Sequence, residues 1–218
     1  MHQTATRTHV EQPVRTPSPA KAARSVRHLG KVPVDLADLA IMPAVTHQQR
    51  MASINLVRRM YARRGYQTGF TDNPLDDSNR IALIAWQDAR PVATLALGRD
   101  SHTGLLAEML YPEEIARLRQ PNRVICELSR LAVDPDYSSL ELLRTLFDKA
   151  HGYGRTFFGA TDVVVEVNPR HARYYVRECG FRQIGGIRQC PRVEAPAVLL
   201  HRSLRVFPAP HSGVPPVH

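Results

Sequence analysis

The sequence predicts a mixed α/β (α+β) sheet flanked by helices. Two apolar segments, residues 81–86 and 92–98, are separated only by the polar turn QDARP, which indicates an antiparallel hairpin. Farther along the chain, strand-like apolar segments alternate with helical ones, as in a strand-helix-strand unit. A hairpin that continues into such a unit gives a sheet with antiparallel and parallel pairs, and a groove is expected where neighbouring strands part.

The chain has 218 residues, of which 43% are hydrophobic, so it can bury one ordinary core. Its formal net charge is +9, but residues 1–33 contribute +5, with six basic residues against one acidic residue. This segment has four prolines and no apolar periodicity, so we expect a disordered basic tail. Residues 34–205 are expected to form one domain, and the Pro-rich residues 206–218 a second loose end.

The first half of the domain begins with a helix. Thr46 is a suitable N-cap, the apolar residues after it have helical spacing, and Gly65 ends the segment. After the hairpin, Pro112 begins a short helix. Residues 123–133 then form a long third strand, which the Asp-Pro pair after it ends.

The second half alternates helix and strand. Ser138, with Glu141 three residues later, forms a capping box for a helix that runs to about His151. The buried strand DVVVEV (162–167) follows, and Gly180 ends the short helix after it. The last two strands are expected over residues 181–188 and 195–203.

Composition argues against several kinds of site. The three cysteines show no C-x-x-C spacing and none of the ten histidines lies in H-E-x-x-H, so neither a disulfide framework nor a metal site is expected. Cys126 on an apolar strand indicates a buried, inert thiol rather than a nucleophile. Without a secretory signal or a run of about 18 apolar residues, we expect a cytoplasmic protein with no membrane span. A transit peptide would resemble the basic tail in composition.

Four segments resemble one enzyme superfamily. They are ELSRLAVDP (127–135), DVVVEVNPRHARYY (162–175), ECGF (178–181) and APAVLL (195–200). Their order and spacing resemble the GCN5-related N-acyltransferase (GNAT) superfamily. Within it they resemble the N-acyl amino acid synthases, which are related to the acyl-homoserine lactone synthases. The resemblance spans roughly residues 50–203 and implies an acyltransferase of GNAT fold, with strands splayed at the active site.

Members of both branches share three features. They carry an E-x-S-R or E-x-T-R pattern on the central strand, an Arg after a Gly at the end of the preceding strand, and an acidic cluster before that hairpin. The matching residues are Glu127, Ser129 and Arg130, then Gly98 and Arg99, then Asp72, Asp76 and Asp77. The resemblance implies that Asp77, Arg99, Ser129 and Arg130 bind substrate.

The acyl donor is indicated by a departure from the superfamily pattern. Members that use coenzyme A place a Gly-rich loop after the central strand, where backbone amides wrap the pyrophosphate. Here that loop is DPDYSSLE (134–141), and its carboxylates would repel the pyrophosphate from the helix N-terminus. We therefore expect the acyl-phosphopantetheine of an acidic acyl carrier protein as donor, with no permanently bound cofactor; acyl-CoA stays the alternative.

Transfer of an acyl group from a thioester to an amine needs a proton acceptor, a site for the oxyanion and an acid for the thiolate. Glu127 is expected to accept the proton or anchor the amine, and backbone amides of the splayed central strand to hold the oxyanion. Tyr175 has the right chemistry for the acid, although its inward position also suits a core residue. Alternatively, Glu127 and Arg130 form a structural ion pair with neighbours such as Arg99 or Asp77.

Arginines are expected to recognise substrate and partner. Arg99 and Arg130 would hold the carboxylate of an amino acid acceptor in a fork. Strand alternation turns Arg130 away from Glu127 and Ser129 unless a bulge intervenes. Arg170, Arg173 and Arg177 recur at helical spacing, which suits either carrier-protein docking or a plain solvated face.

Asn168 and His171 follow the fifth strand, where the resembling superfamily lines its acyl-donor channel. They are therefore candidate substrate-binding residues; His171 could act as a second base, but a polar position at a helix start is the favoured reading.

Together these features predict an N-acyltransferase that moves a medium or long fatty acyl chain from acyl carrier protein to the amine of an amino acid or similar small molecule. Two alternatives stay open. One is an acetyl-CoA-dependent N-acetyltransferase of a small molecule or peptide. The other is an idle domain of this fold that binds nucleic acid or an acidic protein through its tail. The core itself has no signature of specific nucleic acid binding.

Overall fold

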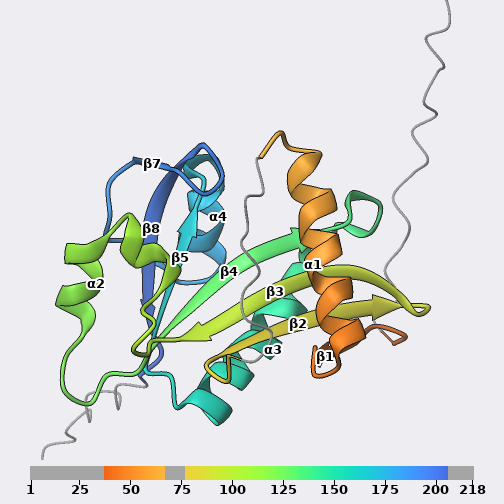
Figure 1. The fold of residues 1–218 in the computed structure, drawn as a ribbon, viewed down its shortest axis with the longest axis horizontal. Coiled ribbons are helices and arrows are strands. Elements are labelled where there is room, and N and C mark those ends of the chain that lie inside the picture. The colour runs from red at the N-terminus through yellow and green to blue at the C-terminus, as the bar shows by residue number, and fades with distance from the viewer. Residues whose placement is uncertain (1–36, 67–76, 206–218) are drawn as a thin grey trace, which may run out of the picture. The chain divides into compact units, whose positions relative to one another are not determined.

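The computed structural model of the protein describes residues 37–66 and 77–205. These residues form an eight-stranded mixed sheet flanked by helices (Figure 1), which confirms the predicted fold class. The predicted tails, residues 1–33 and 206–218, lie outside the described residues, as do Asp72 and Asp76 of the acidic cluster.

The strand order in the sheet is β1-β2-β3-β4-β5-β8-β6, with β7 paired to β8 off this path. The β2–β3 pair is the predicted hairpin, β3 and β4 are antiparallel, and β4 and β5 are parallel. The strands are β1 (Ala40–Pro43), β2 (Arg80–Gln87), β3 (Arg90–Arg99), β4 (Ile125–Val133), β5 (Asp162–Val167), β6 (Arg182–Gln183), β7 (Arg188–Cys190) and β8 (Ala195–Ser203).

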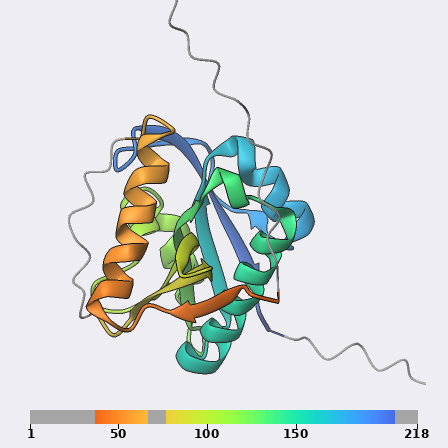
Figure 2. The ribbon, with the colours of Figure 1, turned by 90° about the vertical axis from the view of Figure 1, so that its right-hand side faces the viewer.

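Helices cover both faces of this sheet. Helix α1 packs on β3 and β4 from one side, whereas α3 and α4 lie on the opposite side (Figure 2). None of the helices in the described ranges is long and apolar enough to span a membrane. The helices are α1 (His47–Ala62), α2 (Pro112–Leu118), α3 (Leu140–Phe158) and α4 (Pro169–Glu178), with 3₁₀ turns η1 (Leu106–Met109) and η2 (Pro135–Tyr137).

The central strands β4 and β5 pair over only part of their length. Their parallel register runs from Ile125 opposite Asp162 to Leu128 opposite Val165 and then stops. Beyond Leu128, β4 continues beside β3 under α1, while β5 continues beside β8 (Figure 1). The predicted splaying of strands is therefore present, and it begins one residue past Glu127.

A β-bulge interrupts β4 at this parting. Ala96 of β3 faces Ser129 and Thr94 faces Ala132, so the two β4 residues between them stand opposite a single β3 residue. The first of these, Arg130, has φ of 53°, in the left-handed region where a side chain is disfavoured by about 1 kcal/mol or more. Local backbone strain is thus concentrated where the central strands separate.

Helix α1 begins at Thr46 as predicted, because the Thr46 hydroxyl accepts the Gln49 N–H and the Gln49 side chain accepts the Thr46 N–H. Both boundaries of α3 differ from prediction. Ser139, rather than Ser138, caps α3, which extends to Phe158 because Gly159 supplies the left-handed C-cap.

The predicted strand 181–188 is divided into β6 and β7. Gly185 separates them, and its backbone lies so close to the Tyr111 ring that a Cβ there would stand 2.6 Å from it. Residues 40–43, to which the sequence assigned no element, pair with β2 as β1.

Candidate active site

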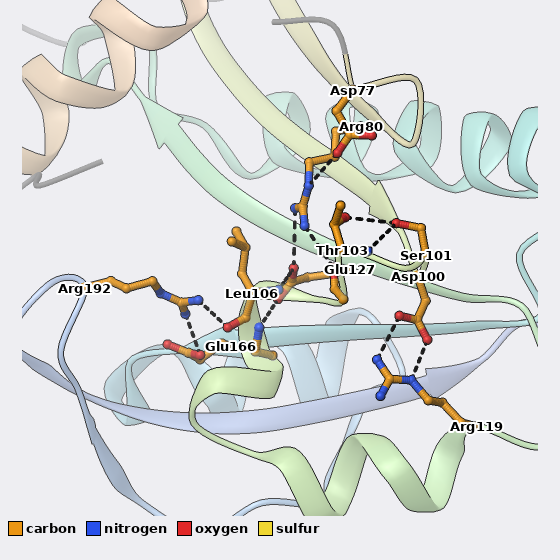
Figure 3. Close-up of polar contacts among 12 residues, drawn as sticks. Asp77, Arg80, Asp100, Ser101, Thr103, Leu106, Arg119, Glu127, Glu166 and Arg192 are labelled. Carbon is orange, nitrogen blue, oxygen red and sulfur yellow. Dashed lines mark hydrogen bonds and ion pairs between the residues drawn. The ribbon is translucent and has the colours of Figure 1, made fainter. Parts of the chain in front are cut away.

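Glu127 is the third residue of β4 and lies on the side of the sheet that carries α1 and η1. Its carboxylate is 2% exposed and accepts two backbone hydrogen bonds, from Leu106 N at 2.8 Å and from Ala107 N at 2.7 Å (Figure 3). Burial raises the pKa of Glu127 above its ordinary value, although these two amides and the Arg192 charge oppose the rise. The carboxylate therefore holds η1 against the sheet, and each oxygen keeps a second lone pair that can accept a proton.

Arg80, at the start of β2, reaches Glu127 across β3. Its guanidinium donates to Gly104 O at 3.1 Å, pairs with Asp77 at 3.2 Å, and lies 3.9 Å from the Glu127 carboxylate. Gly98 stands between Arg80 and Glu127 in the register of the three strands. Because Gly98 has no side chain, the guanidinium can cross the sheet at this point.

Arg192, in the β7–β8 loop, fixes η1 from the other side. Its guanidinium donates to Leu106 O and pairs with Glu166 of β5 at 2.7 Å (Figure 3). Neither Arg80 nor Arg192 was predicted from the sequence as a site residue. The hairpin register would have placed Arg80 opposite Gly98, whereas no sequence signal joins Arg192 to a segment more than 80 residues before it.

Arg130 lies on the same side of the sheet as Glu127, because the bulge reverses the strand alternation. Burial lowers the pKa of Arg130, and the nearby Arg80 charge acts in the same direction, against Tyr61 and Glu127. Without the bulge, strand alternation would have turned Arg130 to the other side of the sheet. The guanidinium is thus held between α1 and the splayed strands.

Arg99 does not join Arg130, so the predicted fork of these two arginines is wrong. Arg99 pairs with Cys126 in the β3–β4 register and alternates with Gly98, which puts it on the α3 side of the sheet at an exposed position. Arg80 takes the place near Arg130 that the prediction gave to Arg99. Glu127 likewise has Arg80, not Arg99, as its closest ionic neighbour.

Asp77 and Ser129 both lie near this cluster. The Asp77 carboxylate accepts the Asn79 N–H at 2.9 Å and pairs with Arg80, so it orients that guanidinium. Ser129 is half-buried, faces Ala96 across the register and follows Glu127 on the same side of β4. The predicted substrate-binding roles of both residues stay predictions.

Tyr175 of α4 is buried in an aromatic cluster. Its ring makes edge-on contacts with Phe147, Tyr174 and Phe181 at centroid distances of 5.6, 5.7 and 5.8 Å. Burial raises its pKa, with smaller contributions from Cys179 and from the Tyr61 phenol of α1. The ring is therefore a core residue, which is one of the two predicted readings, and the role of Tyr175 as the acid stays a prediction.

A family model described as the N-acyl amino acid synthase FeeM matches residues 52–203. The chain belongs to the FeeM family of N-acyl amino acid synthases. It is accordingly an acyltransferase of GNAT fold. The curated protein sequences contain no match to it.

Solved structures agree on the fold. The chain is similar to FeeM, an N-acyl amino acid synthase from uncultured soil microbes, with a TM-score of 0.69 and 21% identity over 76% of this chain and 92% of that one. A putative N-acetyltransferase from Lactobacillus plantarum has a TM-score of 0.57 and 18% identity, covering 77% and 99%. Agmatine N-acetyltransferase has the same TM-score and identity, covering 77% and 100%.

In this FeeM-family chain, Asn168 and His171 lie at the start of α4. The Asn168 side chain caps the helix by accepting the Arg170 N–H at 3.2 Å. His171 is exposed, accepts a hydrogen bond from Arg170 at 3.1 Å, and has a pKa lowered by burial of the ring and by the Arg170 and Arg64 charges. The position of His171 in the first turn of α4 fits a polar residue at a helix start, and its contact with substrate stays a prediction.

Arg170, Arg173 and Arg177 are exposed on α4, as predicted. Arg170 also donates to the Tyr66 hydroxyl at 3.2 Å, which ties the end of α1 to the start of α4. Arg170 therefore adjoins the segment that follows α1.

The described residues contain no cluster of His, Cys, Asp or Glu that could hold a metal ion. Burial raises the pKa of Cys126 to about 12, so its thiol is protonated at neutral pH, as the inert reading predicted.

Proposed function

We propose that this FeeM-family protein transfers a medium or long fatty acyl chain from acyl carrier protein to the amine of an amino acid or similar small molecule. The observation that carries the proposal is the loop between β4 and α3, which has no glycine and uses several of its backbone amides within itself.

Three backbone amides of this loop already donate within it. Asp136 N donates to the Asp134 side chain at 3.2 Å, Tyr137 N to Asp134 O at 3.0 Å, and Ser138 N to Pro135 O at 3.3 Å. In the first turn of α3, Leu142 N donates to the Ser139 hydroxyl at 3.0 Å. A pyrophosphate needs several such donors at once, so this loop supports a donor that brings one phosphodiester instead.

Charge in the loop also supports acyl carrier protein as the donor, but Asp134 contributes less than the sequence indicated. Glu141 stands in the first turn of α3, where a carboxylate satisfies the helix dipole itself. Asp134, however, is turned to Arg59 at 3.3 Å and Arg90 at 2.9 Å, so its charge is already compensated. The occupied amides therefore disfavour coenzyme A more than Asp134 does.

The proposed chemistry breaks the thioester C–S bond and forms a C–N bond to the acceptor. Backbone amides of β4 beyond Leu128, which β5 does not pair, would hold the oxyanion. Glu127 would take the proton of the amine through a water, since the carboxylate is buried, and Tyr175 would protonate the departing thiolate. Arg130 would bind the acceptor carboxylate.

In the experiment, the full-length chain is incubated with acyl carrier protein charged with C14 or C16 chains and with mixed amino acids. New N-acyl products are detected by their mass. Acyl-CoA of the same chain length is the matched comparison, and uncharged carrier protein is the control. Robust turnover of acetyl-CoA, with no product from the charged carrier protein, would overturn the donor assignment.

We further propose that residues 34–205 are the catalytic domain of a cytoplasmic enzyme, with residues 1–33 as a basic tail and 206–218 as a Pro-rich tail. Deleting residues 1–33 tests the rival binding function. Salt-sensitive DNA or RNA binding that is lost on deletion, from a core that transfers no acyl group, would favour a binding module.

A further inference from the structure

A small apolar cavity lies between α3 and the sheet, on the face opposite Glu127. Its volume is about 40 Å³, and the walls are mainly aliphatic and aromatic, with His151 and Arg202 among the polar residues that line it. By this measure one water needs about 10–15 Å³, so the cavity accepts about three methylene-sized groups. The apolar lining includes Leu97, Leu128, Phe147, Gly154, Phe181 and Leu204.

Gly154 forms part of this wall from within α3. A glycine inside a helix is less stable than alanine, because it loses more backbone freedom on folding. A Cβ at Gly154 would lie 3.6 Å from both Leu97 Cδ2 and Ala160 Cβ, which is ordinary van der Waals contact. Alanine would therefore fit, and the glycine keeps open a space that a side chain would occupy.

The cavity adjoins the point where the central strands part. Leu128, which lines it, is the last β4 residue paired with β5. Phe147 and Phe181, which also line it, make edge-on contacts with Tyr175. A chain that entered between the strands and passed Tyr175 would reach the cavity next.

We propose that the cavity receives the terminal carbons of the acyl chain and that Gly154 limits the length of the chain. This inference rests on the proposed function, since it takes a fatty acyl group as the substrate. The apolar walls suit an alkyl terminus, and the small volume suits only its last few carbons.

The experiment compares Gly154→Ala and Gly154→Val with Gly152→Ala and Gly152→Val in the full-length chain. Gly152 lies in the same helix, and a Cβ there meets no atom within 4 Å, so it is a matched control. Both alanine variants should melt higher, by about 2–4 °C. Relative kcat/KM for C8 to C16 acyl carrier protein should shift toward short chains only in the Gly154 variants, by about fourfold for each methylene displaced.

A variant that removes wall volume should act in the opposite direction. Leu97→Val takes one methylene from the cavity wall, so the preference should move toward longer chains. An unchanged chain-length profile in folded Gly154→Val, or an equal shift in Gly152→Val, would overturn the proposal.

The same variants separate this proposal from the proposed function. If the wild-type chain transfers no fatty acyl group from carrier protein or coenzyme A, the proposed function fails. Displacement of a fluorescent fatty acid by free C8 to C16 fatty acids then tests the cavity alone. Weaker binding of the long acids to Gly154→Val than to Gly152→Val would keep the cavity assignment, and equal binding would end it.

Discussion

The Arg80 guanidinium lies 3.9 Å from the Glu127 carboxylate, on the far side of the strand between them. The β3 residue that separates them is Gly98, and a Cβ at that position would stand 3.0 Å from Arg80 Nη1. Asp77 and Gly104 hold the same guanidinium from the other side. The glycine that the family resemblance pointed to thus has a steric reason: it lets a cation on β2 approach a buried carboxylate on β4.

Gly98→Ala should displace the Arg80 guanidinium and weaken its approach to Glu127. We expect the free energy of unfolding to fall by about 1–2 kcal/mol, as is usual when a methyl group is forced into a packed site. Urea unfolding measures this, and Gly186→Ala is the control because no atom lies within 4 Å of a Cβ there. A Gly98→Ala protein as stable as the wild type would mean that Arg80 moves aside freely.

Glu127→Gln should affect both stability and catalysis. The amide can accept only one of the two η1 N–H groups and turns its own NH₂ toward the other, so we expect a loss of about 2–3 kcal/mol in stability. If Glu127 is the proton acceptor, kcat/KM should also fall by about 10²-fold or more. Chemical unfolding and steady-state kinetics on the same sample measure the two effects.

The pH profile separates the two roles of Glu127. Burial raises its pKa, so the carboxylate is protonated and inactive at a higher pH than an ordinary glutamate, whose pKa is about 4.3. Wild-type kcat/KM should therefore fall on the acid side with an apparent pKa above that value, and Glu127→Gln should lack this limb. A variant that keeps the limb, with only its stability reduced, would leave Glu127 as the positioning residue for η1 alone.

The sequence was a good guide to the sheet and a partial guide to the site. The hairpin, the strand 162–167 and the Thr46 cap follow from local patterns, because apolar periodicity and capping chemistry act over a few residues. Arg99 was predicted beside Arg130, but its side chain lies on the other face of the sheet. The residues that Arg99 can meet depend on that face. Arg192 was missed because the contact that matters joins two loops distant in sequence.

The Asp162–His201 pair should make the protein sensitive to acid. His201 Nε2 lies 2.8 Å from Asp162 Oδ1, and both side chains are buried. Burial lowers the pKa of His201, and this effect exceeds the rise caused by Asp162. Burial acts to raise the pKa of Asp162. Hydrogen bonds from His201 and Thr161, together with the Arg123 charge, nevertheless lower the pKa of Asp162 overall. Below about pH 6.5 the unfolded chain binds a proton at this histidine that the folded protein excludes.

The sign follows for both groups. A depressed histidine pKa gives stability that is lost as the pH falls through about 6.5, and a depressed aspartate pKa gives stability that is lost as the pH falls through about 4. Thermal melts should therefore decline from pH 7 to pH 4, and His201→Gln should flatten the upper part of this decline. Asp162→Asn should reduce stability by about 2 kcal/mol at pH 7, because it weakens the hydrogen bonds of the charged carboxylate with His201 and Thr161. A wild-type melting temperature that rises on acidification would contradict both assignments.

The exposed arginines of α4 offer the sharpest test of the donor. If they dock an acidic carrier protein, Arg170→Glu/Arg173→Glu/Arg177→Glu should raise KM for acyl carrier protein by about tenfold or more, because reversal of charge slows association. Transfer from acyl-pantetheine, which has no protein surface, should keep its KM. Arg117→Glu on α2 reverses an exposed charge on another helix and should leave both values unchanged. If the triple variant matched the wild type at low and high salt, the arginines would be a solvated face, and the carrier protein would dock elsewhere or not at all.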